Sequence, residues 1–141
     1  MNVSLRVRDY MVSDPITIRP KTEVMSVARM LVENNISGAI VVDGDRRVVG
    51  ILTERDFIEV ALNAGYFDER GGSVAEFMTQ DVETVGPDDS LVDVAARFVS
   101  SPFRRYPVVE DGRLIGIIAR RDVLRALRSD TWFVGGNDTA E

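Results

Sequence analysis

Two short segments hold the polar side chains whose spacing could do chemistry. One runs from Gly50 to Asp56 and the other from Gly116 to Asp122, and each reads Gly, two aliphatic residues, two variable residues, then Arg and Asp. In each, an apolar run typical of a strand passes into a pattern typical of a helix, which places the Asp in the first helical turn. A carboxylate there can accept both hydroxyls of a ribose, while helix N–H groups and nearby Arg face phosphate. Nucleotide binding is therefore one reading of both segments.

A purely structural reading of the same residues stays open. Thr53 and Asp56 fit a capping box, in which the Thr hydroxyl caps the helix and the acid three residues later returns the hydrogen bond. The second segment has Ala119 in place of the Thr but keeps Asp122. An acid in the first turn still favours the helix dipole, so the sequence alone supports both interpretations.

Composition excludes much catalytic chemistry. The 141 residues contain neither Cys nor His, which removes disulfides, thiolate nucleophiles, imidazole bases and most zinc or transition-metal sites. The adjacent acids Asp88 and Asp89 are expected to favour a helix dipole rather than to form a metal or acid–base site. The formal net charge of −6 argues against a general nucleic-acid binder. We therefore predict no catalytic residue and no metal ligand.

An internal repeat must position the two segments. Residues 11–42 match residues 78–109 at a spacing of 67, and the match resumes at a spacing of 66 from Gly50 and Gly116. The single deletion between them marks a hairpin loop, because turns tolerate length changes. One copy of roughly 60 residues buries too little surface to be comfortably stable. We expect two copies packed sheet to sheet about a pseudo-twofold axis.

Each copy predicts strand, helix, strand, strand, helix. A short strand over 16–18 or 82–85 precedes a helix capped by Thr22 or Ser90, with apolar residues three and four positions apart. Two apolar strands follow, at 39–42 and 48–52 and at 106–109 and 114–118. The second helix begins near Glu54 or Arg120, and its apolar residues are Phe57, Ile58, Ala61 and Leu62 in one copy and Val123, Leu124 and Leu127 in the other.

These elements set the expected boundaries. The first repeat covers residues 7–64, a linker 65–73, the second repeat 74–128 and a C-terminal tail 129–141. In the tail, Trp132-Phe133-Val134 is expected to pack back on its own domain or dimer rather than to bind another protein. The chain has no apolar run of 18 residues, and Arg6, Arg8 and Asp9 interrupt its start. A soluble, cytoplasmic protein is therefore expected.

The duplicated unit, the Gly-to-Asp segments and the Pro-Val-Val strand at Pro107 resemble a tandem pair of cystathionine-β-synthase (CBS) domains, the Bateman module. The resemblance runs from about Val7 to Leu127. It implies an α/β fold of the α+β kind and, without a fused catalytic or channel domain, a stand-alone CBS-pair protein. Members of this family bind AMP, ADP or ATP, sometimes NAD or S-adenosylmethionine, in two clefts between the repeats, and commonly form homodimers. No obligatory cofactor is implied.

The resemblance also implies the residues of each cleft. The principal cleft would combine Thr53, Asp56, Thr84, Arg104, Arg105, Tyr106 and Pro107, with Asp56 on the ribose, Thr84 near the base or ribose and the two Arg on phosphate. The second would combine Thr17, Ser37, Gly38, Ala39, Arg120, Arg121 and Asp122. We expect the second to be weaker, because Ala119 lacks a hydroxyl and Ser37-Gly38 replace Arg104-Arg105.

The sequence therefore predicts a non-catalytic regulatory module that binds an adenine nucleotide and signals occupancy through a conformational change or altered dimer geometry to an unidentified protein. The preference for adenine comes only from the resemblance. The alternative is a structural dimerisation or adaptor module whose clefts are vestigial. Neither hypothesis involves nucleic acid or a membrane.

Overall fold

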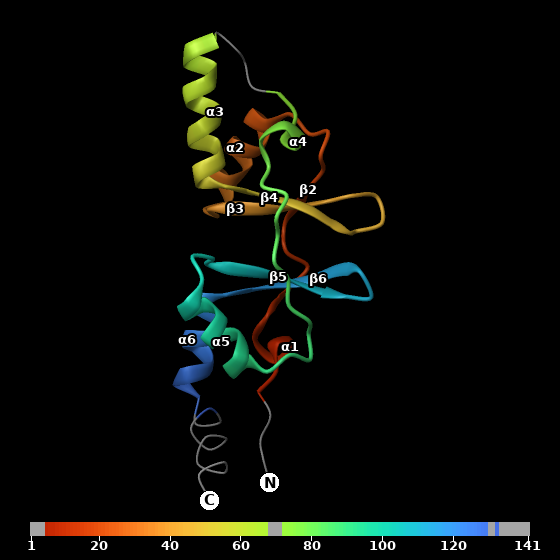
Figure 1. Ribbon diagram of the computed structural model, residues 1–141, viewed down its shortest axis with the longest axis vertical. Helices are drawn as coiled ribbons and strands as arrows, with labels where there is room; N and C mark the ends of the chain where they lie inside the picture. The colour runs from red at the N-terminus through yellow and green to blue at the C-terminus, as the bar shows by residue number, and fades with distance from the viewer. Residues whose placement is uncertain (1–4, 68–71, 130–131, 133–141) are drawn as a thin grey trace, which may run out of the picture. The chain divides into compact units, whose positions relative to one another are not determined.

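The computed structural model describes residues 5–67, 72–129 and 132, with side chains described outside 63–67. These residues form two compact units (Figure 1). Unit 2 covers residues from Ile16 to Val82, and unit 1 joins the residues up to Pro15 with those from Glu83 onward. In each unit the helices lie on one face of a three-stranded sheet (Figure 1).

Unit 2 contains the sheet β2 (Thr17–Ile18), β3 (Gly38–Val42) and β4 (Val48–Thr53), in that spatial order. β2 is parallel to β3, and β3 pairs antiparallel with β4. Its helices are α2 (Val24–Asn34), α3 (Glu54–Phe67) and α4 (Val74–Phe77). The apolar stripe of α2 is buried at Val24, Val27 and Leu31, as its spacing predicts.

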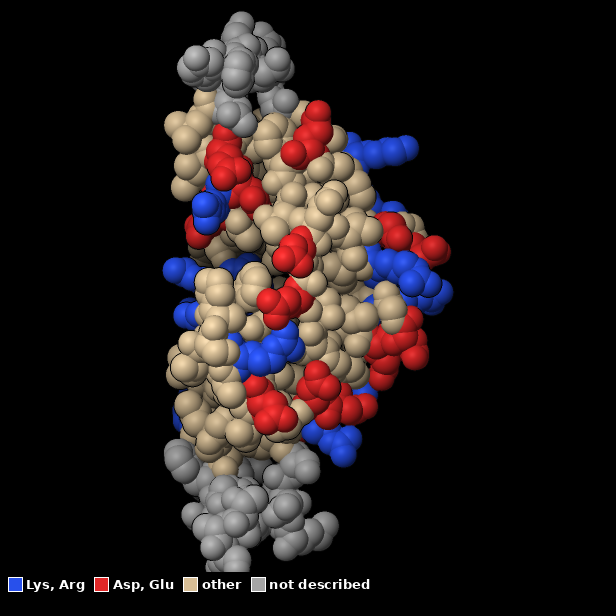
Figure 2. All heavy atoms as spheres, viewed as in Figure 1, with Lys and Arg blue, Asp and Glu red and all other residues tan. Residues whose placement is uncertain are grey.

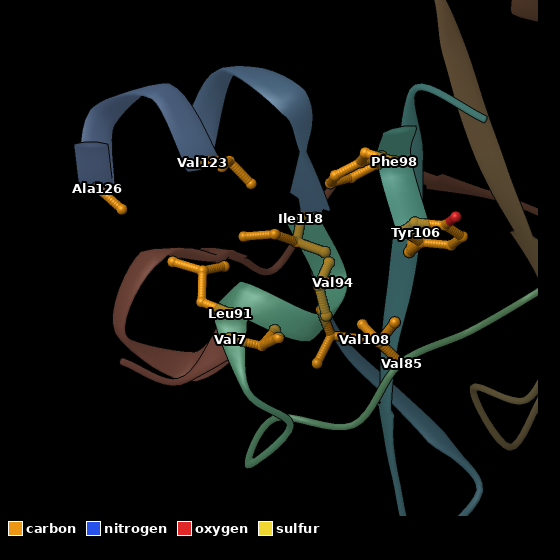
Figure 3. Close-up of a cluster of buried hydrophobic side chains, with 10 residues drawn as sticks. All are labelled: Val7, Val85, Leu91, Val94, Phe98, Tyr106, Val108, Ile118, Val123 and Ala126. Carbon is orange, nitrogen blue, oxygen red and sulfur yellow. The ribbon is translucent and has the colours of Figure 1, made fainter. Parts of the chain in front are cut away.

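Unit 1 repeats this plan. Its sheet is β1 (Val12–Ser13), β6 (Arg113–Ala119) and β5 (Arg105–Glu110), in that spatial order. Its helices are α1 (Val7–Tyr10), α5 (Leu91–Ser100) and α6 (Arg120–Arg128). Figure 3 shows the core between them, built from Val7, Val85, Leu91, Val94, Phe98, Tyr106, Val108, Ile118, Val123 and Ala126.

The spatial units do not coincide with the sequence repeats. The short helix α1 precedes the first repeat's strands in the chain but packs in unit 1, where Val7 N donates to Asp89 O (3.1 Å). Helix α4 opens the second sequence copy but packs in unit 2, where Val74 N donates to Thr22 O (2.8 Å). Each unit therefore contains a short helix from the other sequence copy, so neither sequence copy holds all of one unit.

Most predicted elements are confirmed, including both hairpins and the Ser90 cap of α5, whose hydroxyl accepts from Asp93 N. The predicted Thr22 cap is wrong, because Glu23 is the N-cap of α2 and its carboxylate accepts from Ser26 N (2.7 Å). The predicted strand over 82–85 is reduced to one bridge between Val85 and Val108. Gly86 and a Pro follow directly, and Pro cannot donate to a ladder.

Two remaining features concern the ends of helices. Helix α3 continues through Phe67, so residues 65–67, expected to begin a loop, are helical. Trp132 is partly buried against the core of unit 1, whereas Phe133 and Val134, named with it in the sequence, lie outside the described residues. No helix in the described part of the chain is long and apolar enough to cross a membrane.

Candidate ligand site

The β4–α3 junction gathers the predicted residues of unit 2. β3 and β4 pair with Gly38 opposite Thr53 and Ala39 opposite Leu52. Ser37 lies at the same end, because its carbonyl accepts from Glu54 N (3.1 Å). Thr17 lies one strand further, in β2, opposite Ile40. Unit 2 therefore brings Thr53 and Asp56 of the principal cleft together with Ser37, Gly38, Ala39 and Thr17 of the second.

Asp56 is the central acid of this junction and is only 7% exposed. Its Oδ2 accepts from Thr53 N (2.8 Å) and from Thr53 Oγ1 (3.1 Å). Its Oδ1 accepts from Thr79 Oγ1 (3.3 Å). The Thr53 hydroxyl thus bonds the carboxylate, whereas a capping box would direct it to a helix N–H. Asp56 is held by neutral donors, which a ligand hydroxyl could replace at similar electrostatic cost.

A pocket of about 500 Å³ lies beside Asp56. Its lining joins the junction to α4 and the residues after it, and consists of Thr53, Arg55, Asp56, Glu59, Glu76, Phe77, Met78 and Thr79. The sequence reasoning missed Thr79 as a partner of the acid. The repeat held no signal for it, since the counterpart of Thr79 at the spacing of 67 is Val12, which has no hydroxyl. Carboxylates, hydroxyls and one guanidinium therefore surround a space large enough for a small polar ligand.

The β6–α6 junction gathers the predicted residues of unit 1. Arg105 pairs opposite Ala119 in the sheet, and Arg104 O accepts from Arg120 N (3.2 Å). Pro107 O accepts from Val85 N (3.0 Å), which draws the neighbouring Thr84 to β5. Each predicted cleft takes residues from both units. Within each unit, the structure brings together the predicted cleft residues that belong to that unit.

Two of the predicted residues have structural duties. Arg120 holds the end of α5, because its Nε donates to Phe103 O (3.2 Å) and its Nη2 to Phe98 O (3.4 Å). Tyr106 is a core residue, 1% exposed, with its ring under the Arg97 guanidinium at 4.4 Å. Its hydroxyl bonds Ser101 Oγ (2.8 Å). By contrast, the Arg104 and Arg121 side chains are exposed.

Asp122 is the counterpart of Asp56 and is equally buried, at 6% exposed. Its Oδ2 accepts from Ala119 N (2.8 Å), which repeats the bond between Thr53 and Asp56. Its Oδ1, however, accepts from Arg125 Nη2 (3.0 Å). The two buried acids thus share one bond to their own junction and differ in the partner of the second oxygen.

Family membership follows from this duplicated architecture. The model of the CBS domain matches residues 7–63 and 74–129. The chain therefore belongs to the CBS domain family and carries a tandem CBS pair with an α+β fold.

Solved structures of CBS pairs are close to this fold. The chain is similar to CBSX2 of Arabidopsis thaliana in complex with AMP, with 31% identity and a TM-score of 0.78 over 86% of this chain and 95% of that one. It is also similar to the CBS domain pair of protein MJ0100 in complex with 5′-methylthioadenosine and S-adenosyl-L-methionine. That match has 27% identity and a TM-score of 0.75 over 89% of this chain and 97% of the other.

Sequence relatives are longer than this chain. An uncharacterized protein of Methanocaldococcus jannaschii is 34% identical over 90% of the chain, which spans 44% of that protein. An uncharacterized 17.7 kDa protein of Acidianus ambivalens is 33% identical over 78% of the chain, which spans 65% of it. The inosine-5′-monophosphate dehydrogenase of Korarchaeum cryptofilum is 35% identical over 84% of the chain, which spans 23% of that enzyme.

Proposed function

We propose that this chain is a non-catalytic regulatory module whose principal ligand is an adenine nucleotide such as AMP, ADP or ATP. The observation that carries the proposal is Asp56, a buried acid in the first turn of α3 that is held by threonine hydroxyls and lies beside a pocket. Such an acid can exchange these hydroxyls for those of a ribose. The AMP and S-adenosylmethionine named with similar CBS pairs share that ribose.

Phosphate would be held by Arg104 and Arg105 of unit 1, which complete the principal cleft with Thr84, Tyr106 and Pro107. Arginine suits this role because its planar guanidinium donates to two phosphate oxygens at once. The face in view in Figure 2 carries charges of both signs separated by uncharged surface, so a phosphate site depends on local arginines rather than on a general field. Ser37 and Gly38 occupy the matching positions of the second cleft, which we propose to be weaker.

Occupancy would be signalled through differential affinity. A ligand shifts a protein between two arrangements only to the extent that it binds one more tightly. A nucleotide held by an acid of one unit and arginines of the other would favour the arrangement in which both reach it. A regulated protein that contacts either unit would sense this change.

Thermal unfolding of the apo chain against AMP, ADP, ATP, NAD and S-adenosylmethionine tests the proposal. A ligand present at 100 times its dissociation constant adds about 2.7 kcal/mol of stability, so at least one member should raise the Tm by several degrees. A double variant, Arg104→Ser with Arg105→Gly, copies the second cleft and should lose most of the AMP shift while keeping any shift with adenosine. If no member of the panel shifts the folded chain, the nucleotide hypothesis is wrong.

A second candidate function is assembly, because both units expose large apolar side chains at matching helix positions. Val32 and Val99 are 82% and 89% exposed, and Ile58 and Leu124 are 61% and 64% exposed. Exposed apolar surface of this kind marks interfaces. We infer that these faces meet in a homodimer, which serves both the regulatory module and the alternative adaptor.

Charge favours one pairing of these faces. Helix α3 carries three acidic residues and one basic residue, whereas α6 carries four basic residues and one acidic residue. Two α6 helices would repel each other, as would two α3 helices, but α3 of one copy and α6 of a second attract. The pairing is therefore expected to be head to tail, with Ile58 of one copy near Leu124 of the other.

The cysteine-free sequence allows a direct test by oxidation. Ile58→Cys chains mixed with Leu124→Cys chains should form a disulfide-linked dimer, while either variant alone should not. A control pair with Cys at Asp45 and Asp111, in the two hairpin turns, should stay uncrosslinked. Efficient crosslinking of Ile58→Cys alone would show that α3 meets α3 of the second copy and not α6. A monomer by light scattering would contradict the homodimer.

A further inference from the structure

The pocket beside Asp56 has a residue-by-residue counterpart in unit 1. Spacings of 66 and 67 carry its lining onto Ala119, Arg121, Asp122, Arg125, Asp9, Tyr10, Met11 and Val12. Arg and Asp at the junction and the Met are identical in the two sets, while Phe77 corresponds to Tyr10. The difference with the largest change in charge is at Glu59, whose counterpart is Arg125. A carboxylate in one unit is thus a guanidinium in the other.

Arg125 lies over the acid of its own unit. Its Nη2 donates to Asp122 Oδ1 (3.0 Å) and to Tyr10 O (2.8 Å). Its guanidinium carbon lies 5.8 Å from the centre of the Tyr10 ring. The Arg125 side chain is 48% exposed while that of Asp122 is 8% exposed, so the guanidinium covers the buried carboxylate from the solvent side.

We propose that Arg125 is an internal plug, a tethered cation that occupies in unit 1 the place that a ligand hydroxyl takes beside Asp56 in unit 2. The inference rests on the proposed function, since it takes Oδ1 of the junction acid, which accepts from the Thr79 hydroxyl in unit 2, as the acceptor of a ligand hydroxyl. The plug means that each chain binds one nucleotide, at Asp56, and that the Arg125 side chain closes the second site at Asp122.

The chemistry of the two partners supports this assignment. A charge-assisted hydrogen bond from guanidinium to carboxylate is stronger than one from a neutral hydroxyl. Arg125 is also held on α6 only three residues from Asp122, so it competes with the ligand at a high effective concentration. A ribose hydroxyl would have to displace the bond from Arg125 Nη2 to take its place on Asp122 Oδ1.

Unit 2 lacks the corresponding competitor. Glu59 has no N–H to donate, and Asp56 Oδ1 instead accepts from the Thr79 hydroxyl at 3.3 Å. The donor of that bond is an uncharged hydroxyl, and the bond is longer than the 3.0 Å bond that the Arg125 guanidinium makes. A ligand hydroxyl therefore meets a weaker competitor at Asp56 than at Asp122.

Titration calorimetry with AMP, and in parallel with S-adenosylmethionine, measures the number of sites per chain. Wild type should bind one equivalent of nucleotide. Arg125→Ala should bind a second equivalent, with an affinity at least about tenfold above the upper limit that the wild-type titration sets for a second site. Arg128→Ala removes one exposed arginine from the same helix and is the matched control, which should stay at one equivalent. Circular dichroism confirms that each variant is folded.

The reverse change keeps the proposal testable even if Arg125→Ala fails to fold. Glu59→Arg puts a guanidinium at the matching exposed position of unit 2 and should abolish the single AMP site, while Glu59→Gln should retain it. Two equivalents in wild type, one in folded Arg125→Ala, or full binding in Glu59→Arg would each overturn the plug and leave the proposed function intact. No binding by wild type or any variant would overturn both. Binding by Arg125→Ala alone would support the block of Asp122 by Arg125 but would overturn the assignment of the ligand to Asp56, and with it the proposed function.

Discussion

The junctions of the two units show how a duplicated site can keep its buried acid and change what that acid contacts. Asp56 and Asp122 end matching segments and are 7% and 6% exposed, and each accepts a bond from the backbone N–H three residues earlier, Thr53 N or Ala119 N. One acid then bonds a hydroxyl beside a pocket, and the other bonds a guanidinium of its own helix. The residue one helical turn after the acid thus decides whether the acid is available.

The largest expected effect comes from removing each acid in turn. Asp56→Ala should weaken AMP binding by about 100-fold, since it deletes hydrogen bonds between a charged group and the ribose, each worth about 1.5–3 kcal/mol. Asp122→Ala should leave AMP affinity within about threefold of wild type. Equilibrium dialysis with labelled AMP measures both. An equal loss in the two variants would contradict the asymmetry of the units.

The next effect concerns stability at the matched glycines. A Cβ on Gly116 would lie 2.7 Å from Met11 Sδ and 2.9 Å from Val12 O, whereas a Cβ on Gly50 would lie 2.5 Å from Met78 Sδ and 3.1 Å from Thr79 O. A backbone oxygen yields less than a flexible side chain, and it lies closer at Gly116, so Gly116→Ala should cost about 2 kcal/mol and Gly50→Ala about 1 kcal/mol or less.

Urea unfolding measures this difference, and two probes separate the units. Trp132, the single tryptophan, packs against the core of unit 1, so its fluorescence follows that unit, while circular dichroism follows the whole chain. Gly116→Ala should lower the urea midpoint by fluorescence more than Gly50→Ala does. The opposite order would show that the Met11 segment moves more easily than the Met78 segment.

A smaller effect is expected at the second oxygen of Asp56. Thr79→Val copies Val12 of unit 1 and deletes the hydroxyl that bonds Asp56 Oδ1. Because the donor is an uncharged hydroxyl whose place on Asp56 a ribose hydroxyl would take, its loss should change AMP affinity by no more than about fivefold. A 100-fold loss in Thr79→Val would make this hydroxyl part of the ligand contact itself.

The smallest effect is a pH dependence confined to unit 1. A hydrogen bond and the charge of Arg8, together with Arg6, hold the pKa of Asp88 below its ordinary value. A lowered folded pKa contributes stability above the unfolded value that is lost as the pH falls through the folded one. Asp88→Asn should therefore lower the Tm slightly at pH 7, and its difference from wild type should begin to shrink below about pH 4 and vanish once the pH is below the folded pKa of Asp88.

Asp81→Asn removes an exposed carboxylate of unit 2 and is the control for the loss of charge. Its Tm difference from wild type should show no such change between pH 7 and pH 3. Equal pH profiles for the two variants would mean that Asp88 does not tie α1 to unit 1.

Local patterns in the sequence were enough to predict most of the elements. The apolar spacing in α2 and α5 and the apolar runs on either side of both hairpin loops are patterns within about a dozen residues, and local propensity acts over the same range. The Thr22 cap failed because the choice between Thr22 and Glu23 depends on where the chain enters α2. That entry is fixed by Val24 N, which donates to Gly72 O (2.8 Å), almost fifty residues away.

The sequence by itself determined the duplication, the presence of an acid at each junction and the absence of Cys and His, because these depend on residue type and spacing alone. Only the tertiary structure decided that the acids are buried and what each acid contacts. Thr79 reaches Asp56, and Tyr10 reaches the Arg125 that bonds Asp122, because α4 and α1 pack in the unit that the other sequence copy supplies. The contact of Thr79 with Asp56 joins residues that are 23 positions apart in the chain, and that of Arg125 with Tyr10 joins residues 115 positions apart. Such contacts arise from packing, which no local pattern encodes.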